Sequence, residues 1–274
     1  MKSINLVWSE FDNVETINKT YYTEKNKNDD IFDNILKLKH GMKILDVGCG
    51  TGYLTIDIAK KVFPDGSVVG LDRSRKLMKY GIEKAEQNNI RNIEFIRGDG
   101  RNIQYPNNYF DLVFSKYMLQ NYSSNLVPFV KEMKRVVKDN GKIVAIDREN
   151  ISATWPPFSN AYQKLLKAME EYERIIGWGD RTTGRKLYSA FVKSGLSRIF
   201  VCPDYIQRVG QSLTVKEEED FKNNWFALKK DIVDKFTLLN YDDFINGIES
   251  GINDLKIKER FFMEIERYLI IGFK

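Results

Sequence analysis

Residues 44–52 read Ile44-Leu45-Asp46-Val47-Gly48-Cys49-Gly50-Thr51-Gly52, an apolar run that leads directly into three alternating glycines. The apolar run predicts a buried strand, and the apolar side chains of residues 51–63 recur at helical spacing. Glycine permits a tight turn and lets a ligand approach the main chain. The first N–H groups of a helix have no partner within the helix. The stretch therefore predicts a strand–turn–helix unit that binds a ligand at the turn.

The same alternation continues beyond the glycines. Strands are expected at residues 43–47, 67–71, 93–96, 109–114 and 142–146. Helices are expected at residues 29–38, 51–63, 74–88 and 123–138. Strands that alternate with helices predict an α/β fold with a parallel sheet. Because the crossovers are right-handed, ligands bind at the carboxyl ends of the strands.

The second half of the chain is mainly helical. Helices are expected at residues 158–176 and 183–193, and Thr214 with Glu217 forms a capping box that opens another. Further helical stretches are expected up to about Met263. Residues 196–209, irregular at Pro203, and residues 268–273 predict strands. We expect an N-terminal arm (1–28), a ligand-binding core (29–150) and a helical cap with the last strands of the sheet (151–274).

The spacing of the glycines discriminates between ligands. A dinucleotide fingerprint needs a third glycine at the position of Tyr53, and no P-loop pattern is present. Two carboxylates follow the next strands. Asp72 ends the second strand, where it can accept hydrogen bonds from ribose hydroxyls, and Asp99 stands between Gly98 and Gly100 after the third. These features, in this order, favour an adenosyl ligand.

The pattern resembles motif I of the class I S-adenosylmethionine methyltransferases, and the resemblance covers roughly residues 30–150. It is strongest to small-molecule methyltransferases, including the quinone-biosynthesis type. The resemblance implies a Rossmann-like sheet of seven mostly parallel strands with helices on both faces. Residues 268–273 would be its antiparallel last strand. It also implies S-adenosylmethionine as the cofactor.

The resemblance assigns the first cofactor contacts to the glycine turn. Gly48, Gly50 and Gly52 would lie against the cofactor. Asp46 would help to hold its amino-acid end.

The other cofactor residues implied by the resemblance follow the next three strands. Asp72 would take the ribose hydroxyls, with Arg73 beside the adenine. Asp99 and Gly100 would bind the adenine, and Ser115, just past the fourth strand, would lie under the methionine part.

The sequence departs from the family after the fourth strand, where many relatives carry a histidine near the position of Gln120. The catalytic residues are therefore left unassigned. Methyl transfer depends mainly on aligning the acceptor with the methyl group, so a missing histidine does not exclude it. The candidates for acceptor contact are Tyr117, Gln120, Asp147, Arg148 and Glu149, the last three following the fifth strand.

Composition limits the other classes of function. The chain has 274 residues and a net charge of +5, with basic residues spread along its length, which argues against a nucleic-acid partner. Cys49 and Cys202 lie far apart and His40 is the single histidine, so no metal site is expected. No run reaches the roughly 18 apolar residues of a membrane span. We expect a cytoplasmic monomer or homodimer that acts on a small molecule.

Three alternatives remain open. The chain could bind S-adenosylmethionine without catalysis, as a sensor or structural protein. It could instead methylate protein or nucleic acid, although Ser115-Lys116-Tyr117-Met118 stands where a motif that holds an extruded base would follow the fourth strand. A dehydrogenase is disfavoured by Tyr53.

Overall fold

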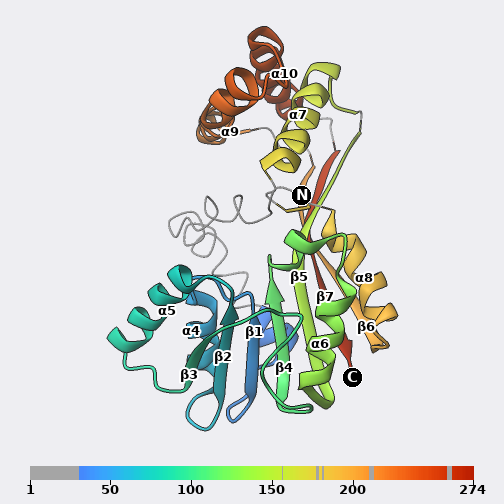
Figure 1. Ribbon diagram of the computed structural model, residues 1–274. Helices are drawn as coiled ribbons and strands as arrows, with labels where there is room; N and C mark the ends of the chain where they lie inside the picture. The colour runs from blue at the N-terminus through green and yellow to red at the C-terminus, as the bar shows by residue number, and fades with distance from the viewer. Residues whose placement is uncertain (1–30, 156, 177–178, 181, 210–212, 258–260) are drawn as a thin grey trace. The chain divides into compact units, whose positions relative to one another are not determined.

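The computed structural model describes residues 31–155, 157–176, 179–180, 182–209, 213–257 and 261–274, so the expected arm at residues 1–28 lies outside them. The described strands form one seven-stranded sheet (Figure 1). They are β1 (Lys43–Val47), β2 (Ser67–Asp72), β3 (Ile93–Arg97), β4 (Phe110–Lys116), β5 (Val137–Trp155), β6 (Ser197–Val209) and β7 (Phe261–Phe273). The α-helices are α4 (Tyr53–Val62), α5 (Arg75–Gln87), α6 (Val127–Val136), α7 (Asn160–Ile176), α8 (Thr183–Lys193), α9 (Val215–Lys229) and α10 (Tyr241–Lys256). Shorter helical segments are η1 (Ile31–Leu36), η2 (Leu119–Tyr122) and η3 (Lys230–Lys235).

The sheet has the strand order β3-β2-β1-β4-β5-β7-β6. The neighbours from β3 to β5 pair in parallel. The end of β7 lies at the beginnings of β6 and β5: Ser197 Oγ donates to Phe273 O at 3.2 Å, and Lys274 N donates to Gly141 O at 3.3 Å. β7 therefore runs antiparallel to both. The seven-stranded, mostly parallel sheet expected from the sequence is confirmed.

The order of strands fixes where a ligand can bind. From β1 the chain moves outward through β2 to β3 and then returns to β4 on the other side of β1. Such a reversal opens a crevice outside the carboxyl ends of the strands beside it. The glycine turn follows β1 directly, so it lies at this point of reversal.

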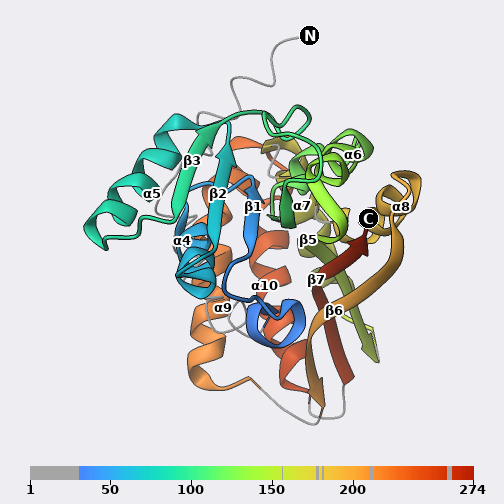
Figure 2. The ribbon, with the colours of Figure 1, turned by 90° about the horizontal axis from the view of Figure 1, so that it is seen from below.

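Alternating side chains of the strands build a core on each face of the sheet. Leu45 and Val47 of β1 pack into a core with α6 and α8, whereas Ile44 packs with η1 and α4. α6 and α8 lie side by side on their face (Figure 2). Because successive residues of a strand point to opposite faces, β1 is apolar on both sides, as a central parallel strand requires.

The described chain forms two compact units. The first holds the residues up to Asp147, Thr183–Cys202 and Tyr268–Lys274, and the second holds Arg148–Thr182 and Pro203–Arg267. The second unit has its own core of α7, α9, η3 and α10 side chains. The division into arm, core and cap stays a prediction. Within the described ranges, no helix combines the length and apolarity needed to cross a membrane.

Several expected bounds in the first half were wrong. The expected helix at 123–138 begins only at Val127, because residues 119–122 form the separate turn η2 and Pro128 favours a helix start. It ends at Val136, where β5 begins. Of the described part of the expected helix at 29–38, Ile31–Leu36 is helical, as a π-helix, and residues 37 and 38 are not.

In the second half, tertiary pairing extends the strands. β6 continues through Pro203, which an edge strand tolerates because one side of its backbone needs no partner. β7 begins at Phe261, within the stretch expected to be helical up to Met263. The capping box of Thr214 and Glu217 is confirmed, and α8 has the expected bounds.

Gly81 lets α5 approach the glycine turn. A Cβ atom at this position would lie 2.9 Å from Thr51 O and 2.8 Å from Phe95 Cζ. Replacing Gly81 by Ala should therefore lower the free energy of unfolding by about 1–3 kcal/mol, although alanine is the better helix former. Chemical denaturation measures the change. Exposed Glu86→Ala on the same helix is the control, and a Gly81→Ala protein as stable as this control would contradict the close packing.

Candidate functional site

The glycine turn after β1 has a left-handed backbone. Gly48, Gly50 and Gly52 have φ values of 82°, 54° and 74°. A Cβ atom at Gly48 would overlap the Met118 side chain, and one at Gly52 would lie 2.5 Å from Phe95 Cε1. Both the left-handed backbone and the close approach of neighbours therefore require glycine at these two positions.

Asp72, the last residue of β2, holds this turn in place. Its Oδ2 accepts from Gly50 N at 2.8 Å, and its Oδ1 accepts from Ser74 N at 2.8 Å. Ser74 in turn caps α5, because its hydroxyl accepts from Leu77 N at 3.3 Å. A carboxylate has about four lone-pair sites, so it can accept several hydrogen bonds at once, including those of vicinal hydroxyls.

Asp46 lies buried beneath the turn, 2% exposed, and its Oδ2 accepts from the Thr55 hydroxyl at 2.7 Å. Burial raises the pKa of Asp46 to about 7, with a smaller contribution from the negative charge of Asp72. The Thr55 hydrogen bond and Lys116 oppose the shift. A cation bound nearby would favour the ionised carboxylate.

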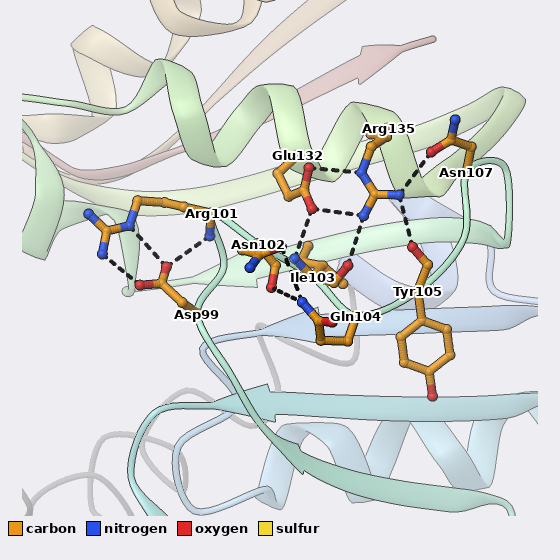
Figure 3. Close-up of polar contacts among 9 residues, drawn as sticks. All are labelled: Asp99, Arg101, Asn102, Ile103, Gln104, Tyr105, Asn107, Glu132 and Arg135. Atoms are coloured by element: carbon orange, nitrogen blue, oxygen red, sulfur yellow. Dashed lines mark hydrogen bonds and ion pairs between the residues drawn. The ribbon is translucent and has the colours of Figure 1, made fainter.

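The loop after β3 carries Asp99, which Arg101 engages in two ways. The guanidinium donates to both carboxylate oxygens, at 3.0 Å and 2.6 Å, and Arg101 N donates to Oδ1 at 2.9 Å (Figure 3). These contacts lower the pKa of Asp99. The predicted hydrogen bond from Asp99 to an adenine amino group must therefore use the remaining lone pairs or displace Arg101.

Helix α6 fastens the same loop through an ion pair. Glu132 accepts from Ile103 N at 2.8 Å and pairs with Arg135 at 2.8 Å. Arg135 also donates to the carbonyl oxygens of Ile103 and Tyr105, each at 2.8 Å, and to Asn107 (Figure 3). The guanidinium group carries five N–H donors in a rigid planar arrangement, so it can bind several loop carbonyls at once.

Aromatic side chains connect this loop with the end of β2. Arg73 Nη1 donates to the Tyr122 hydroxyl at 2.7 Å, and the rings of Tyr122 and Phe129 lie 4.4 Å apart. The Arg101 guanidinium lies over Phe129, 5.6 Å from its ring centre. A Cβ at Gly100 would meet Phe129 at 3.0 Å. The sequence analysis missed Arg101, Tyr122 and Phe129, and only the arginine two residues after Asp99 gave a local signal.

Polar groups also gather at the end of β4 and at the point in β5 where its pairing with β4 ends. Ser115 lies within β4, not past it as expected, and its fully buried hydroxyl has no hydrogen-bond partner among the described residues. Tyr117 adopts φ 56°, an uncommon conformation for a bulky side chain, and its N–H donates to Ile146 O. Gln120 N donates to Asp147 Oδ1 at 3.1 Å. The first compact unit thus brings Tyr117, Gln120 and Asp147 to one edge.

The expectation that residues 147–149 follow the fifth strand was wrong, because β5 continues to Trp155. The β4–β5 pairing ends at Ile146, but the strand extends into the second unit. Arg148 and Glu149 belong to that second unit, with Glu149 2% exposed. Among the described residues, no group of three or more His, Cys, Asp or Glu side chains could hold a metal ion.

Residues 38–195 match a known family described as a methyltransferase domain. The chain belongs to this family. Among its relatives, demethylmenaquinone methyltransferase of Staphylococcus carnosus is 38% identical over 132 residues, 48% of this chain and 53% of the relative. The chain thus spans about half the length of the curated relatives that it matches.

Solved structures of other proteins share the fold. YcgJ of Bacillus subtilis aligns with a TM-score of 0.58 at 15% identity, over 91% of this chain and 98% of that one. Phosphoethanolamine N-methyltransferase 2 of Haemonchus contortus, in complex with phosphomonomethylethanolamine and S-adenosylhomocysteine, aligns with a TM-score of 0.55 at 18% identity. That alignment covers 91% of this chain and 53% of the other.

Replacing Arg135 by Leu should release the loop after β3 from helix α6. The loss of several charge-assisted hydrogen bonds should lower the free energy of unfolding by about 2–3 kcal/mol. Hydrogen exchange at Ile103 N should accelerate as well, because its acceptor Glu132 loses the pairing guanidinium. Lys131→Ala, on the exposed side of α6, is the control. Unchanged hydrogen exchange at Ile103 N would show that the loop after β3 keeps its conformation without Arg135.

Replacing Asp46 by Asn should stabilise the free protein in a pH-dependent way. The folded-state pKa of about 7 lies above the ordinary 3.8, so the folded protein loses stability as the pH rises from about 4 to 7. Asparagine carries no charge and avoids this loss. At pH 8 the free energy of unfolding of the variant should exceed that of the wild type by up to about 4 kcal/mol. At pH 4 the two proteins should differ little. Equal differences at both pH values would contradict the shifted pKa.

Proposed function

We propose that this protein transfers a methyl group from S-adenosylmethionine to a small-molecule acceptor. The observation that carries the proposal is the glycine turn after β1, tied to the β2 carboxylate of Asp72 and lying above the buried Asp46. This arrangement offers a main-chain surface flanked by two carboxylates, which suits a ligand with hydroxyls at one end and a positive charge at the other. Membership of the methyltransferase family supports the same ligand.

The residues fit the cofactor on independent grounds. The Asp72 carboxylate can accept hydrogen bonds from the ribose hydroxyls, and the buried Asp46 carboxylate can pair with the positive charge of the cofactor. The buried Ser115 hydroxyl, which lacks a hydrogen-bond partner among the described residues, is available to the methionine part. When bound, S-adenosylmethionine supplies an activated methyl group on a sulfonium. The roles of Arg73, Asp99 and Gly100 at the adenine are part of this proposal.

Methyl transfer depends more on alignment of the acceptor with the methyl group than on acid–base chemistry. The single histidine, His40, stands three residues before β1, at the edge opposite to the carboxyl ends of the strands. Orientation of two reactants can contribute about 7–11 kcal/mol, so methyl transfer does not require a histidine base. Tyr117, just after β4, Gln120, in η2, and Asp147, where the pairing of β5 with β4 ends, are the proposed acceptor contacts. The relatives named for demethylmenaquinone support a quinone-type acceptor.

The decisive experiment is calorimetric titration with S-adenosylmethionine, S-adenosylhomocysteine and NAD, followed by methyl transfer to a quinol acceptor. Micromolar binding of both adenosyl ligands without NAD binding, and turnover with the quinol, would support the proposal. Adenosyl binding without turnover on any acceptor would favour a non-catalytic sensor. No adenosyl binding would overturn the proposed cofactor.

Replacing Asp72 by Ala should weaken the binding of S-adenosylhomocysteine by about 1–3 kcal/mol, or about fivefold to 150-fold. The variant loses both the ribose acceptor and the anchor of Gly50 N. Ser74→Ala, which removes the helix cap but leaves the carboxylate, is the matched control and should bind within about threefold of the wild type. An equal loss of affinity for S-adenosylhomocysteine in Asp72→Ala and Ser74→Ala would mean that Asp72 acts only through the cap of α5.

A further inference from the structure

Two buried polar atoms of the first compact unit stand outside the cofactor assignment. The Gln120 side chain is 8% exposed and that of Thr183 is 0% exposed. Within the described part of the chain, neither Gln120 Oε1 nor Thr183 Oγ1 has a hydrogen-bond partner. Leaving a buried polar group unsatisfied destabilises a fold, so such atoms in a native structure point to a missing partner.

The path of α8 places Thr183 at the same edge of the sheet as Gln120. The carboxyl end of α8 lies where the parallel strands begin, because Lys134, next to the start of β5, donates to Ser194 O at 3.3 Å. Ser197, just beyond, contacts the end of β7. Eleven residues of α-helix span about 16 Å, roughly the length of the strands, so α8 begins near their carboxyl ends.

The segment η2 lies between β4 and α6 in sequence and contacts α8, and α6 and α8 run alongside each other (Figure 1). Because the far end of α8 is held at the opposite edge by Lys134, we infer that η2 contacts the part of α8 nearer to Thr183. Gln120, in η2, and Thr183, the first residue of α8, therefore stand on neighbouring elements at the carboxyl edge.

We propose that Gln120 and Thr183 form the polar part of the acceptor site and bind a hydroxyl group of the acceptor, such as that of a phenol or enol. A hydroxyl donates one hydrogen bond and accepts others, so it can satisfy both the amide oxygen and the threonine hydroxyl. The amino end of α8 adds a partial positive charge, which suits the lone pairs of the hydroxyl oxygen that face Thr183. This inference rests on the proposed methyl-transfer function.

The neighbouring Thr182 provides a contrast within the same turn. Its hydroxyl donates to Asp180 Oδ1 at 2.6 Å, and its N–H donates to the same atom at 2.8 Å. Thr182 thus has a structural hydrogen bond, whereas the Thr183 hydroxyl has none among the described residues. The two threonines are adjacent in sequence, so they form a matched pair for substitution.

The first measurement is thermal unfolding of the free protein with Thr183→Val, Gln120→Met and Thr182→Val. The first two variants remove a polar atom that has no hydrogen-bond partner in the described ranges, so they should keep or raise the melting temperature. Thr182→Val loses a hydrogen bond and should melt lower than the wild type. A drop for Thr183→Val or Gln120→Met as large as that for Thr182→Val would overturn the proposal, because the polar atom would then have a structural partner.

The second measurement is calorimetric binding of 1-naphthol and of naphthalene in the presence of saturating S-adenosylhomocysteine. The wild type and Thr182→Val should bind 1-naphthol at least tenfold more tightly than naphthalene. Thr183→Val and Gln120→Met should lose most of this preference and retain their affinity for S-adenosylhomocysteine. A wild type without preference for 1-naphthol, or variants that keep it, would overturn the proposal.

The two proposals fail in different ways. Absence of S-adenosylhomocysteine binding to the wild type would overturn the proposed function, and the melting temperatures would still test whether the two polar atoms lack structural partners. Normal S-adenosylhomocysteine binding with no preference for the hydroxyl would overturn only the acceptor site.

Discussion

The Asp72 carboxylate is the interaction on which the carboxyl edge of the sheet depends. One of its oxygens accepts from Gly50 N in the turn after β1, and the other accepts from Ser74 N at the start of α5. A single side chain thus fixes two turns that are 24 residues apart, from Gly50 to Ser74. Because Gly48, in the same turn, packs against Met118, the position of the turn also affects the segment that follows β4.

The carboxyl edge of the sheet contains buried polar groups that are not expected at an edge with only a structural role. Asp46 is buried with a raised pKa, and Ser115, Gln120 and Thr183 each bury an oxygen that has no hydrogen-bond partner among the described residues. Each such group reduces the stability of the free protein. Their position at the carboxyl edge of one sheet is the physical argument for ligand binding, since natural proteins violate local rules chiefly at functional sites.

The two sides of the proposed site are built differently. The loop after β3, on the cofactor side, is fastened to α6 by the Glu132–Arg135 pair and its carbonyl acceptors. The acceptor side draws on η2 and α8, and the chain that precedes α8 belongs to a second unit with its own helical core. A common cofactor-binding sheet with variable segments around it is how one fold serves different substrates.

The sequence by itself determined the elements whose signals are local. The apolar run into the glycines, the Ser74 cap, the capping box of Thr214 and the bounds of α8 all depend on residues within a few positions. Tertiary structure alone decided how far β5 and β7 extend, that Arg101 engages Asp99, and that Thr183 is buried. Strand length depends on a pairing partner, and burial depends on segments distant in sequence. No local pattern carries that information.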